Sequence, residues 1–190
     1  MHTNVNTALS PAAFAHAWRI IVMGVSGCGK STLAHRLAVD LGLLMVDGDD
    51  LHLPQSVEKM SAGIALEDAD RWPWLDRIGK FLEQAEPSMG RIVACSALKR
   101  SYRDRIRAQA GPVRFVFLDG APALIRQRMQ MRVGHYMQAG LLDSQLQTLE
   151  KPSADEPDVI TLNIAQPIDT LVTQAVSALA LTKLTGTSIG

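Results

Sequence analysis

Short runs of consecutive apolar residues alternate along the chain with longer stretches in which apolar residues recur every three or four positions. The first pattern is typical of strands buried on both faces, and the second is typical of amphipathic helices. Strands that alternate with helices predict a parallel sheet with right-handed crossovers and helices on both faces. The five expected strands cover residues 19–23, 43–46, 91–95, 113–118 and 158–163.

The expected helices are marked by apolar stripes and by helix breakers. The first has Leu33 and Leu37 on one face and is ended by Gly42. A longer one over 67–86 contains Pro73 near its start, where a missing N–H costs little. The full set covers 30–41, 56–62, 67–86, 101–109, 122–132 and 168–184, with weaker helical signals around 141–149.

Length and composition indicate one domain with a sizeable core, which we place at 19–184, between an extension over 1–18 and a tail over 185–190. The extension lacks the basic start and apolar core of a signal peptide, and no apolar run approaches membrane-spanning length. The formal net charge is zero, so we expect neither nucleic acid nor a membrane as partner. Two cysteines, Cys28 and Cys95, fit a reducing compartment.

The strongest motif follows the first expected strand and has the pattern G-x-x-x-x-G-K-[ST], set between a strand and a helix. The backbone N–H groups of such a loop and of the following helix end attract phosphate. Lys30 adds a point charge for the β- and γ-phosphates, and Ser31 offers a hydroxyl to Mg²⁺. The alternative is a glycine-rich turn with a chance Lys-Ser. The motif comprises Gly24, Val25, Ser26, Gly27, Cys28, Gly29, Lys30 and Ser31.

Polar residues follow the second expected strand, at the sheet edge where open α/β sheets bind their ligands. Of Asp47 and Asp49, one could hold a water on Mg²⁺ and the other could accept a proton from an attacking hydroxyl. Asp-Gly-Asp is also turn chemistry, which is the alternative. Taken singly, His52, Lys59 and Arg71 read as ordinary surface.

Two later stretches leave the same choice between function and plain structure. Residues 95–99 leave the third strand through small side chains, which suits either a backbone close to a ligand or an ordinary strand-to-helix turn. Arg128 and Arg132 share one helix face and lead into the polar stretch from Gly134. They could close onto a transferring phosphate as part of a lid, or they could form a solvated face.

Together these motifs resemble the gluconokinase family. The likeness covers roughly residues 19–180, in order and at the spacing of the family. The phosphate loop is shared by many families, whereas the Asp-Gly-Asp, Glu-Lys-Met, Pro-Trp-Leu and Cys-Ser-Ala-Leu-Lys set is much more specific. The matching stretches are 23–31, 46–52, 58–60, 70–75, 95–99, 102–104, 132–135, 145–155 and 166–167.

The resemblance implies an α/β fold of the P-loop nucleotide-kinase type, a three-layer sandwich with a five-stranded parallel sheet in the order 2-3-1-4-5 and a lid over about 134–150. It implies ATP-dependent phosphorylation of D-gluconate at its 6-hydroxyl, giving 6-phospho-D-gluconate and ADP, with Mg²⁺. The family is cytoplasmic and often dimeric and serves gluconate utilisation through the pentose phosphate and Entner–Doudoroff routes. We therefore expect a cytoplasmic homodimer.

The resemblance also assigns roles to residues. Asp49 would be the base on the substrate hydroxyl, Asp47 would support Mg²⁺ with Ser31, and Arg71 would hold the gluconate carboxylate. The catalytic set would be Lys30, Asp49 and Arg132. The ATP contacts would be the loop residues with Thr32, Arg128 and Gln166. The substrate contacts would be Asp49, His52, Lys59, Arg71, Ser96, Lys99, Arg103 and His135.

Cys28 stands where the family commonly has Ser. It reads as a tolerated small residue rather than a catalytic thiol, although helix-terminus N–H groups and Lys30 create a field that favours a thiolate.

Two other kinds of protein compete with this interpretation. The nearest alternative among the enzymes is a kinase for another polyol acid or for shikimate. A nucleotide-switched protein such as a GTPase would share only the phosphate loop, and its usual Asn-Lys-x-Asp box does not occur in the sequence.

Overall fold

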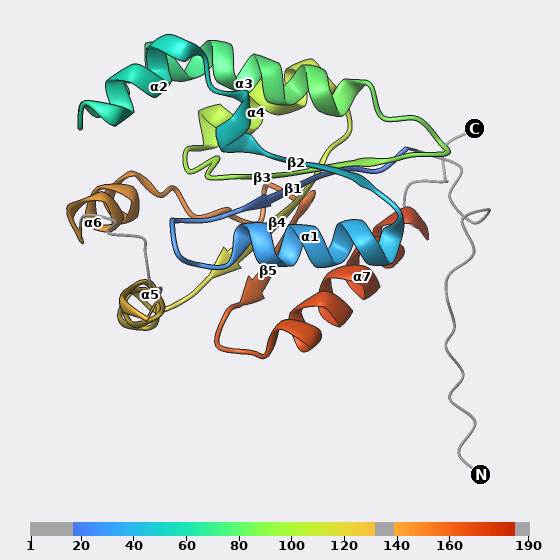
Figure 1. Cartoon of the computed structure of the whole chain (residues 1–190). Helices are drawn as coiled ribbons and strands as arrows, with labels where there is room; N and C mark the ends of the chain where they lie inside the picture. The colour runs from blue at the N-terminus through green and yellow to red at the C-terminus, as the bar shows by residue number, and fades with distance from the viewer. Residues whose placement is uncertain (1–16, 132–138, 185–190) are drawn as a thin grey trace.

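The structure is a computed structural model that describes residues 17–131 and 139–184, and its core is a parallel sheet in the order β2-β3-β1-β4-β5 (Figure 1). The α/β class and this strand order confirm the sequence prediction, and every strand begins and ends within one residue of its expected position. The strands are β1 (Arg19–Met23), β2 (Leu44–Asp47), β3 (Arg91–Cys95), β4 (Arg114–Asp119) and β5 (Val159–Asn163).

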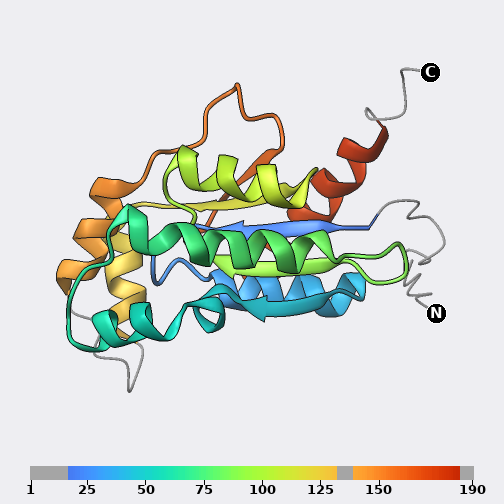
Figure 2. The same cartoon turned by 90° about the horizontal axis from the view of Figure 1, so that it is seen from above.

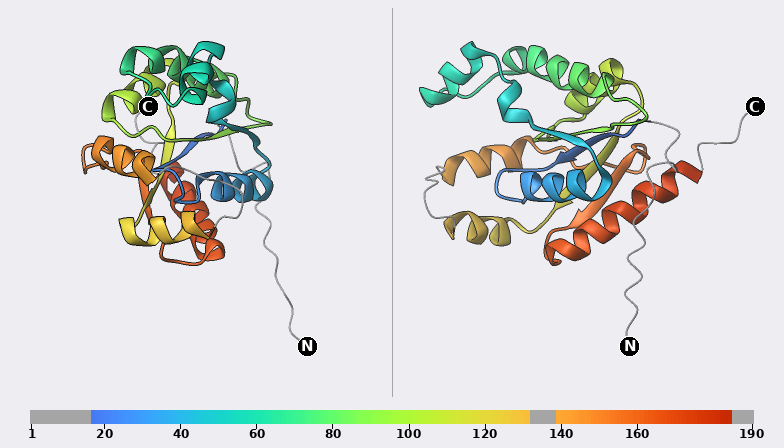
Figure 3. Two further views of the ribbon diagram at one scale, coloured as in Figure 1. Left: turned by 60° about the vertical axis from the view of Figure 1, so that its left-hand side comes forward. Right: turned by 45° about the vertical axis from the view of Figure 1, so that its right-hand side comes forward.

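Helices form a layer on each face of the sheet, as Figures 1 and 3 show. One layer contains α1 (Lys30–Leu41) and α7 (Ile168–Leu184), and the other contains α3 (Asp68–Glu83) and α4 (Arg100–Ala110). The sandwich therefore has the expected three layers. Within the described residues, none of these helices is both long enough and apolar enough to cross a membrane.

Three further helices lie at one end of the sheet. They are α2 (Pro54–Ser61), α5 (Pro122–Gln130) and α6 (Ala139–Thr148). In Figures 1 and 2 this is the left-hand end, toward which the carboxyl ends of the parallel strands point. A short 3₁₀-helix, η2 (Gly48–Leu51), which the sequence did not predict, follows β2 at the same end. The expected ligand-binding edge is thus surrounded by separate segments of the chain.

The central strand β1 explains why both helix layers are needed. Side chains along a strand alternate between its two faces. Ile20 and Val22 belong to the apolar cluster beneath α1 and α7, whereas Ile21 and Met23 belong to the cluster beneath α3 and α4. All four are at most 1% exposed. Their burial fixes β1, and so fixes the loop that leaves its carboxyl end.

Helix α3 (Asp68–Glu83) is shorter than the predicted 67–86 by one residue at its start and by three residues at its end. Its first turn is stabilised by a capping box, in which the Glu67 N–H donates to Asp70 Oδ2 at 2.9 Å. Pro73 lies inside the helix and not in its first turn, so the expectation that its missing N–H costs little was wrong. The carbonyl of Ala69, four residues earlier, loses its usual helical donor.

Arg103 is the site residue whose expected role the structure contradicts. It is 1% exposed, and its Nε and Nη2 donate to the two oxygens of Glu156 at 2.7 and 2.6 Å. Its Nη1 donates to the carbonyls of Ala97, Leu98 and Glu150. The expected substrate contact is therefore wrong. Arg103 instead fastens the segment that precedes β5 to α4.

The buried pair gives a test of this fold. Glu156→Gln leaves the Arg103 charge uncompensated, and we expect it to lower the free energy of unfolding at pH 7 by about 3–5 kcal/mol. Urea denaturation measures this loss. Asp155→Asn is the matched control, because Asp155 pairs with Arg100 at the surface and such exposed pairs contribute about 0–1 kcal/mol.

The same substitution has a pH signature. Arg103 holds the pKa of Glu156 at about 2, below its ordinary 4.5, with help from Arg107 and against desolvation. A depressed pKa in the folded state stabilises the protein above pH 4.5, and this stabilisation is lost as the pH falls toward 2. Glu156→Gln should remove that part of the acid sensitivity. Equal stability of variant and parent at pH 7 would contradict the assigned role.

Candidate active site

The phosphate loop connects β1 to α1 and places the first turn of α1 at the carboxyl edge of the sheet. Gly29 caps the helix with φ 102° and ψ 18°, a left-handed conformation that L side chains rarely adopt. The Lys30 ammonium lies against the loop, 3.0 Å from the carbonyl oxygen of Val25. The loop therefore presents backbone donors and one cation together, as an anion site requires.

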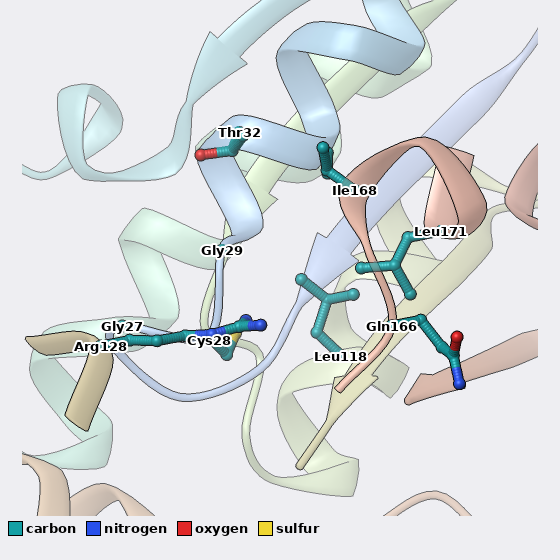
Figure 4. A pocket seen from close by; sticks show the side chains of 9 residues that line it. All are labelled: Gly27, Cys28, Gly29, Thr32, Leu118, Arg128, Gln166, Ile168 and Leu171. Atoms are coloured by element: carbon teal, nitrogen blue, oxygen red, sulfur yellow. The ribbon is translucent and has the colours of Figure 1, made fainter. Parts of the chain in front are cut away.

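A pocket of about 310 Å³ opens beside this loop (Figure 4). The structure brings Arg128 and Gln166, two expected ATP contacts, to this pocket, and Arg128 extends along the loop in the figure. Arg128 is held there because its Nη2 donates to the carbonyl of Ile164 at 2.7 Å. The lining comprises Gly27, Cys28, Gly29, Thr32, Leu118, Arg128, Gln166, Ile168 and Leu171. Apolar walls next to phosphate donors suit the base and the phosphates of a nucleotide.

The expected metal ligands meet at the same edge. The Ser31 hydroxyl donates to Asp47 Oδ2 at 2.8 Å, so the start of α1 and the end of β2 present adjacent oxygens. Mg²⁺ is usually held by one or two protein oxygens, several waters and substrate phosphates. No cluster of three or more His, Cys, Asp or Glu side chains that could hold a metal ion occurs in the part of the chain that the structure describes.

Asp49 lies on the turn that follows β2, and two contacts fix this turn. Asp47 Oδ1 accepts the Asp49 N–H at 3.1 Å, and Trp74 Nε1 donates to the carbonyl of Gly48 at 2.6 Å. Gly48 packs directly on β3, because a Cβ there would come within 2.7 Å of the Cβ of Cys95. The Asp-Gly-Asp turn is therefore rigidly presented toward the phosphate loop.

The carboxylate of Asp49 is exposed at the rim of the site, yet its pKa is raised. Partial desolvation by the surrounding protein is the main cause, and the nearby Asp47 charge adds to it. Lys30 and His52 oppose the rise. A carboxylate with a raised pKa is a better proton acceptor than an ordinary aspartate, as a general base requires.

His52 extends this site away from the phosphate loop. Its ring stacks on Trp74 with centroids 4.4 Å apart and planes 8° apart. Desolvation, together with the Arg71 charge, lowers its pKa despite the opposing effect of Asp49. Its buried Nδ1 has no hydrogen-bond partner among the described residues. A neutral imidazole next to Asp49 thus retains one unsatisfied polar atom.

A cluster of charged and polar side chains is built around the carboxylate of Asp68. Lys99 Nζ donates to both oxygens of Asp68 at 2.9 and 2.8 Å, and the Tyr102 hydroxyl donates to the same carboxylate. Arg71 lies 3.7 Å from Asp68 and donates to the Tyr102 hydroxyl at 3.4 Å. Lys99 and then Tyr102 hold the pKa of Asp68 below its usual range. The structure therefore brings the expected substrate cations Arg71 and Lys99 together.

The other expected contacts are distributed as follows. Lys59 Nζ donates to Asp70 Oδ1 at 2.6 Å. The Arg71 charge also acts on Asp70, so Lys59 and Arg71 share this acidic neighbour in the electrostatics of the site. Ser96 follows β3 and precedes Ala97, whose φ of 40° is unusual for a residue with a side chain. Arg132 and His135 lie outside the described residues. The lid expected over about 134–150 overlaps α6, and its first part is also outside them.

Four residues that shape this site were given no site role from the sequence, although Trp74, Tyr102 and Gln145 lie in stretches that match the family. Asp68 pairs with both Lys99 and Arg71. Tyr102 donates to Asp68 and accepts from Arg71. Trp74 holds the Gly48 turn, and Gln145 of α6 accepts the Ser26 N–H of the phosphate loop. The Glu-x-x-Asp spacing at 67–70 signals a helix start and could have pointed to the acidic residues near it. The other contacts join residues far apart in the sequence and leave no local pattern.

Cys28 does not have the low pKa that the sequence suggests. The residue is 1% exposed, and desolvation by burial raises the pKa of its thiol, outweighing the opposing effects of Lys30 and the loop N–H groups. Complete burial likewise raises the pKa of Cys95 to about 12. Both thiols are therefore protonated at neutral pH, and the expectation of a thiolate in the loop was wrong.

Comparisons with known proteins show which proteins this chain resembles. Residues 20–152 match the AAA domain family. The chain is 50% identical over 139 residues to a gluconokinase of Gluconobacter oxydans, covering 73% of this chain and 78% of that protein. It is 43% identical over 156 residues to the thermosensitive gluconokinase of Escherichia coli, covering 81% and 83%. A gluconokinase structure from Sinorhizobium meliloti aligns with a TM-score of 0.81 and 43% identity, over 90% of this chain and 98% of that one.

Proposed function

The chain belongs to the gluconokinase family, and from that premise we propose how it transfers the γ-phosphoryl group of ATP to the 6-hydroxyl of D-gluconate. The products are 6-phospho-D-gluconate and ADP. One observation carries the assignment of roles. The Ser31–Asp47 hydrogen bond places the phosphate loop against the turn that presents Asp49.

On the nucleotide side, the chain supplies position and charge. The loop N–H groups and Lys30 receive the phosphates, while Arg128 and Gln166 line the pocket beside them. Phosphoryl transfer leaves little covalent work for the protein, so fixed donors aimed at the developing charge are the main contribution. The loop is held between β1 and α1, and this fixes the direction of its donors.

On the substrate side, Asp49 accepts the proton of the 6-hydroxyl as that oxygen attacks the γ-phosphorus and ADP leaves. A sugar acid also needs partners for its carboxylate and its other hydroxyls. Arg71 and Lys99 provide the cations, and His52, which is close enough to Asp49 and Arg71 to be affected by their charges, offers its unsatisfied Nδ1. Substrate hydroxyls bound by such partners allow analogues that lack them to be rejected.

Mg²⁺ fits the oxygen pair of Ser31 and Asp47, which would hold it directly or through water. When bound, the ion would neutralise charge on the ATP phosphates. The chain's own contribution is to keep Asp47 at the Ser31 hydroxyl while Asp49 stays free for the substrate.

From the family resemblance we also propose that the protein is a cytoplasmic homodimer. Sedimentation of the purified chain would establish its oligomeric state.

The function is tested by a coupled assay that follows ADP formation with Mg²⁺ and a panel of acceptors. We expect ATP consumption to depend on added gluconate and to be much slower with shikimate and with sugar acids that lack the 6-hydroxyl. Faster turnover with another acid would show that the chain is a kinase for that acid and not for gluconate. Hydrolysis of nucleotide without any acceptor would favour a nucleotide-switched protein.

The two carboxylates can be separated by substitution. Asp49→Asn removes the proton acceptor, so we expect turnover to fall by roughly 10²–10⁴-fold with ATP binding nearly unchanged. Asp47→Asn should instead raise the Mg²⁺ concentration needed for half-maximal rate. Steady-state rates over a Mg²⁺ series measure both effects.

Asp50→Asn is the matched control, since Asp50 is the next residue of the same turn and is exposed. Full turnover by Asp49→Asn would exclude it as the base. An Asp47→Asn defect independent of Mg²⁺ would show that the roles are reversed.

A further inference from the structure

A side chain from α6 reaches into the phosphate loop. Gln145 Oε1 accepts the backbone N–H of Ser26 at 2.6 Å, across 119 positions of sequence. Ser26 is the third residue of the phosphate-loop motif, and the backbone N–H groups of such loops cradle phosphates. An amide oxygen, which is partly negative, therefore occupies one backbone donor of a loop that is built to hold phosphate.

Packing, rather than chance, places Gln145 there. Leu142 of the same helix is 1% exposed in the core cluster beneath α1 and α7, and Leu146 packs against that cluster. The Arg126–Asp143 ion pair joins α6 to α5, and the Glu150 N–H donates to the carbonyl of Leu98 just beyond the helix. The side chain of Gln145 is half-buried between these anchors.

One N–H has one hydrogen to donate, so Gln145 and a phosphate oxygen compete for Ser26. Hydrogen bonds to an ionised acceptor are roughly twice as strong as those between neutral groups. We propose that Gln145 occupies the Ser26 N–H in the nucleotide-free protein, that ATP displaces it, and that this exchange sets part of the ATP affinity. The proposal rests on the proposed function only in taking ATP as the nucleotide.

The chemistry of glutamine suits this role. Its oxygen satisfies a donor that would otherwise lack a partner, and a neutral amide does not repel an incoming phosphate. A carboxylate at the same position would hold the N–H more tightly and would add negative charge beside the phosphates. Gln145 therefore satisfies the Ser26 N–H but can still be replaced there by a phosphate oxygen.

The test measures the dissociation constants of ATP and adenosine, with Mg²⁺, for the full chain by calorimetry. Gln145→Ala and Gln145→Met remove the competing acceptor, and Met keeps the length of the side chain. We expect both variants to bind ATP about 2- to 10-fold more tightly, the worth of one hydrogen bond. Adenosine, which has no phosphate, should bind as in the parent. Gln147→Ala is the matched control, because Gln147 is exposed on the same helix.

Gln145→Glu provides the opposite sign, since the added charge should weaken ATP binding and leave adenosine binding unchanged. Unchanged or weaker ATP binding by both Gln145→Ala and Gln145→Met would overturn the proposal, as would a parallel change in adenosine affinity. A parent chain that binds ATP but does not phosphorylate gluconate would overturn the proposed function alone. A parent that binds no ATP would overturn both.

Discussion

The hydrogen bond from the Ser31 hydroxyl to Asp47 is the contact on which the site depends. Ser31 belongs to the first turn of α1, after β1, whereas Asp47 ends β2, and β3 lies between these two strands in the sheet. The contact can form only because the strand order and the parallel register bring both carboxyl ends to one edge. It joins the part of the site that receives phosphate to the part that presents Asp49.

Buried polar contacts hold the surrounding segments at this edge. Trp74 fixes the Gly48 turn from α3, and the Arg103–Glu156 pair fixes the segment before β5 to α4. A broken buried ion pair costs more than a surface pair, so such contacts tolerate few alternatives.

Local patterns predicted the strands, the first and last helices and the phosphate loop, because each depends on residues adjacent in the sequence. The role of Arg103 was misjudged, because a basic residue in a family motif does not reveal the Glu156 that encloses it, 53 positions away. Cys28 was misjudged for a related reason: the loop sequence shows the nearby charges but not the burial that outweighs them. The partners of Asp68, Trp74 and Gln145 lie far away in the sequence, so even where a family motif includes the residue its contact could not be predicted.

The most direct measurement is a crystal structure of the chain with Mg²⁺, a non-hydrolysable ATP analogue and gluconate. The account predicts that the 6-hydroxyl lies within hydrogen-bond distance of the Asp49 carboxylate and faces the terminal phosphate. It places the gluconate carboxylate near Arg71 and Lys99, with Ser31 and Asp47 at the metal. A 6-hydroxyl bound by Asp47, or gluconate in the reverse orientation with its carboxylate near Asp49, would contradict it.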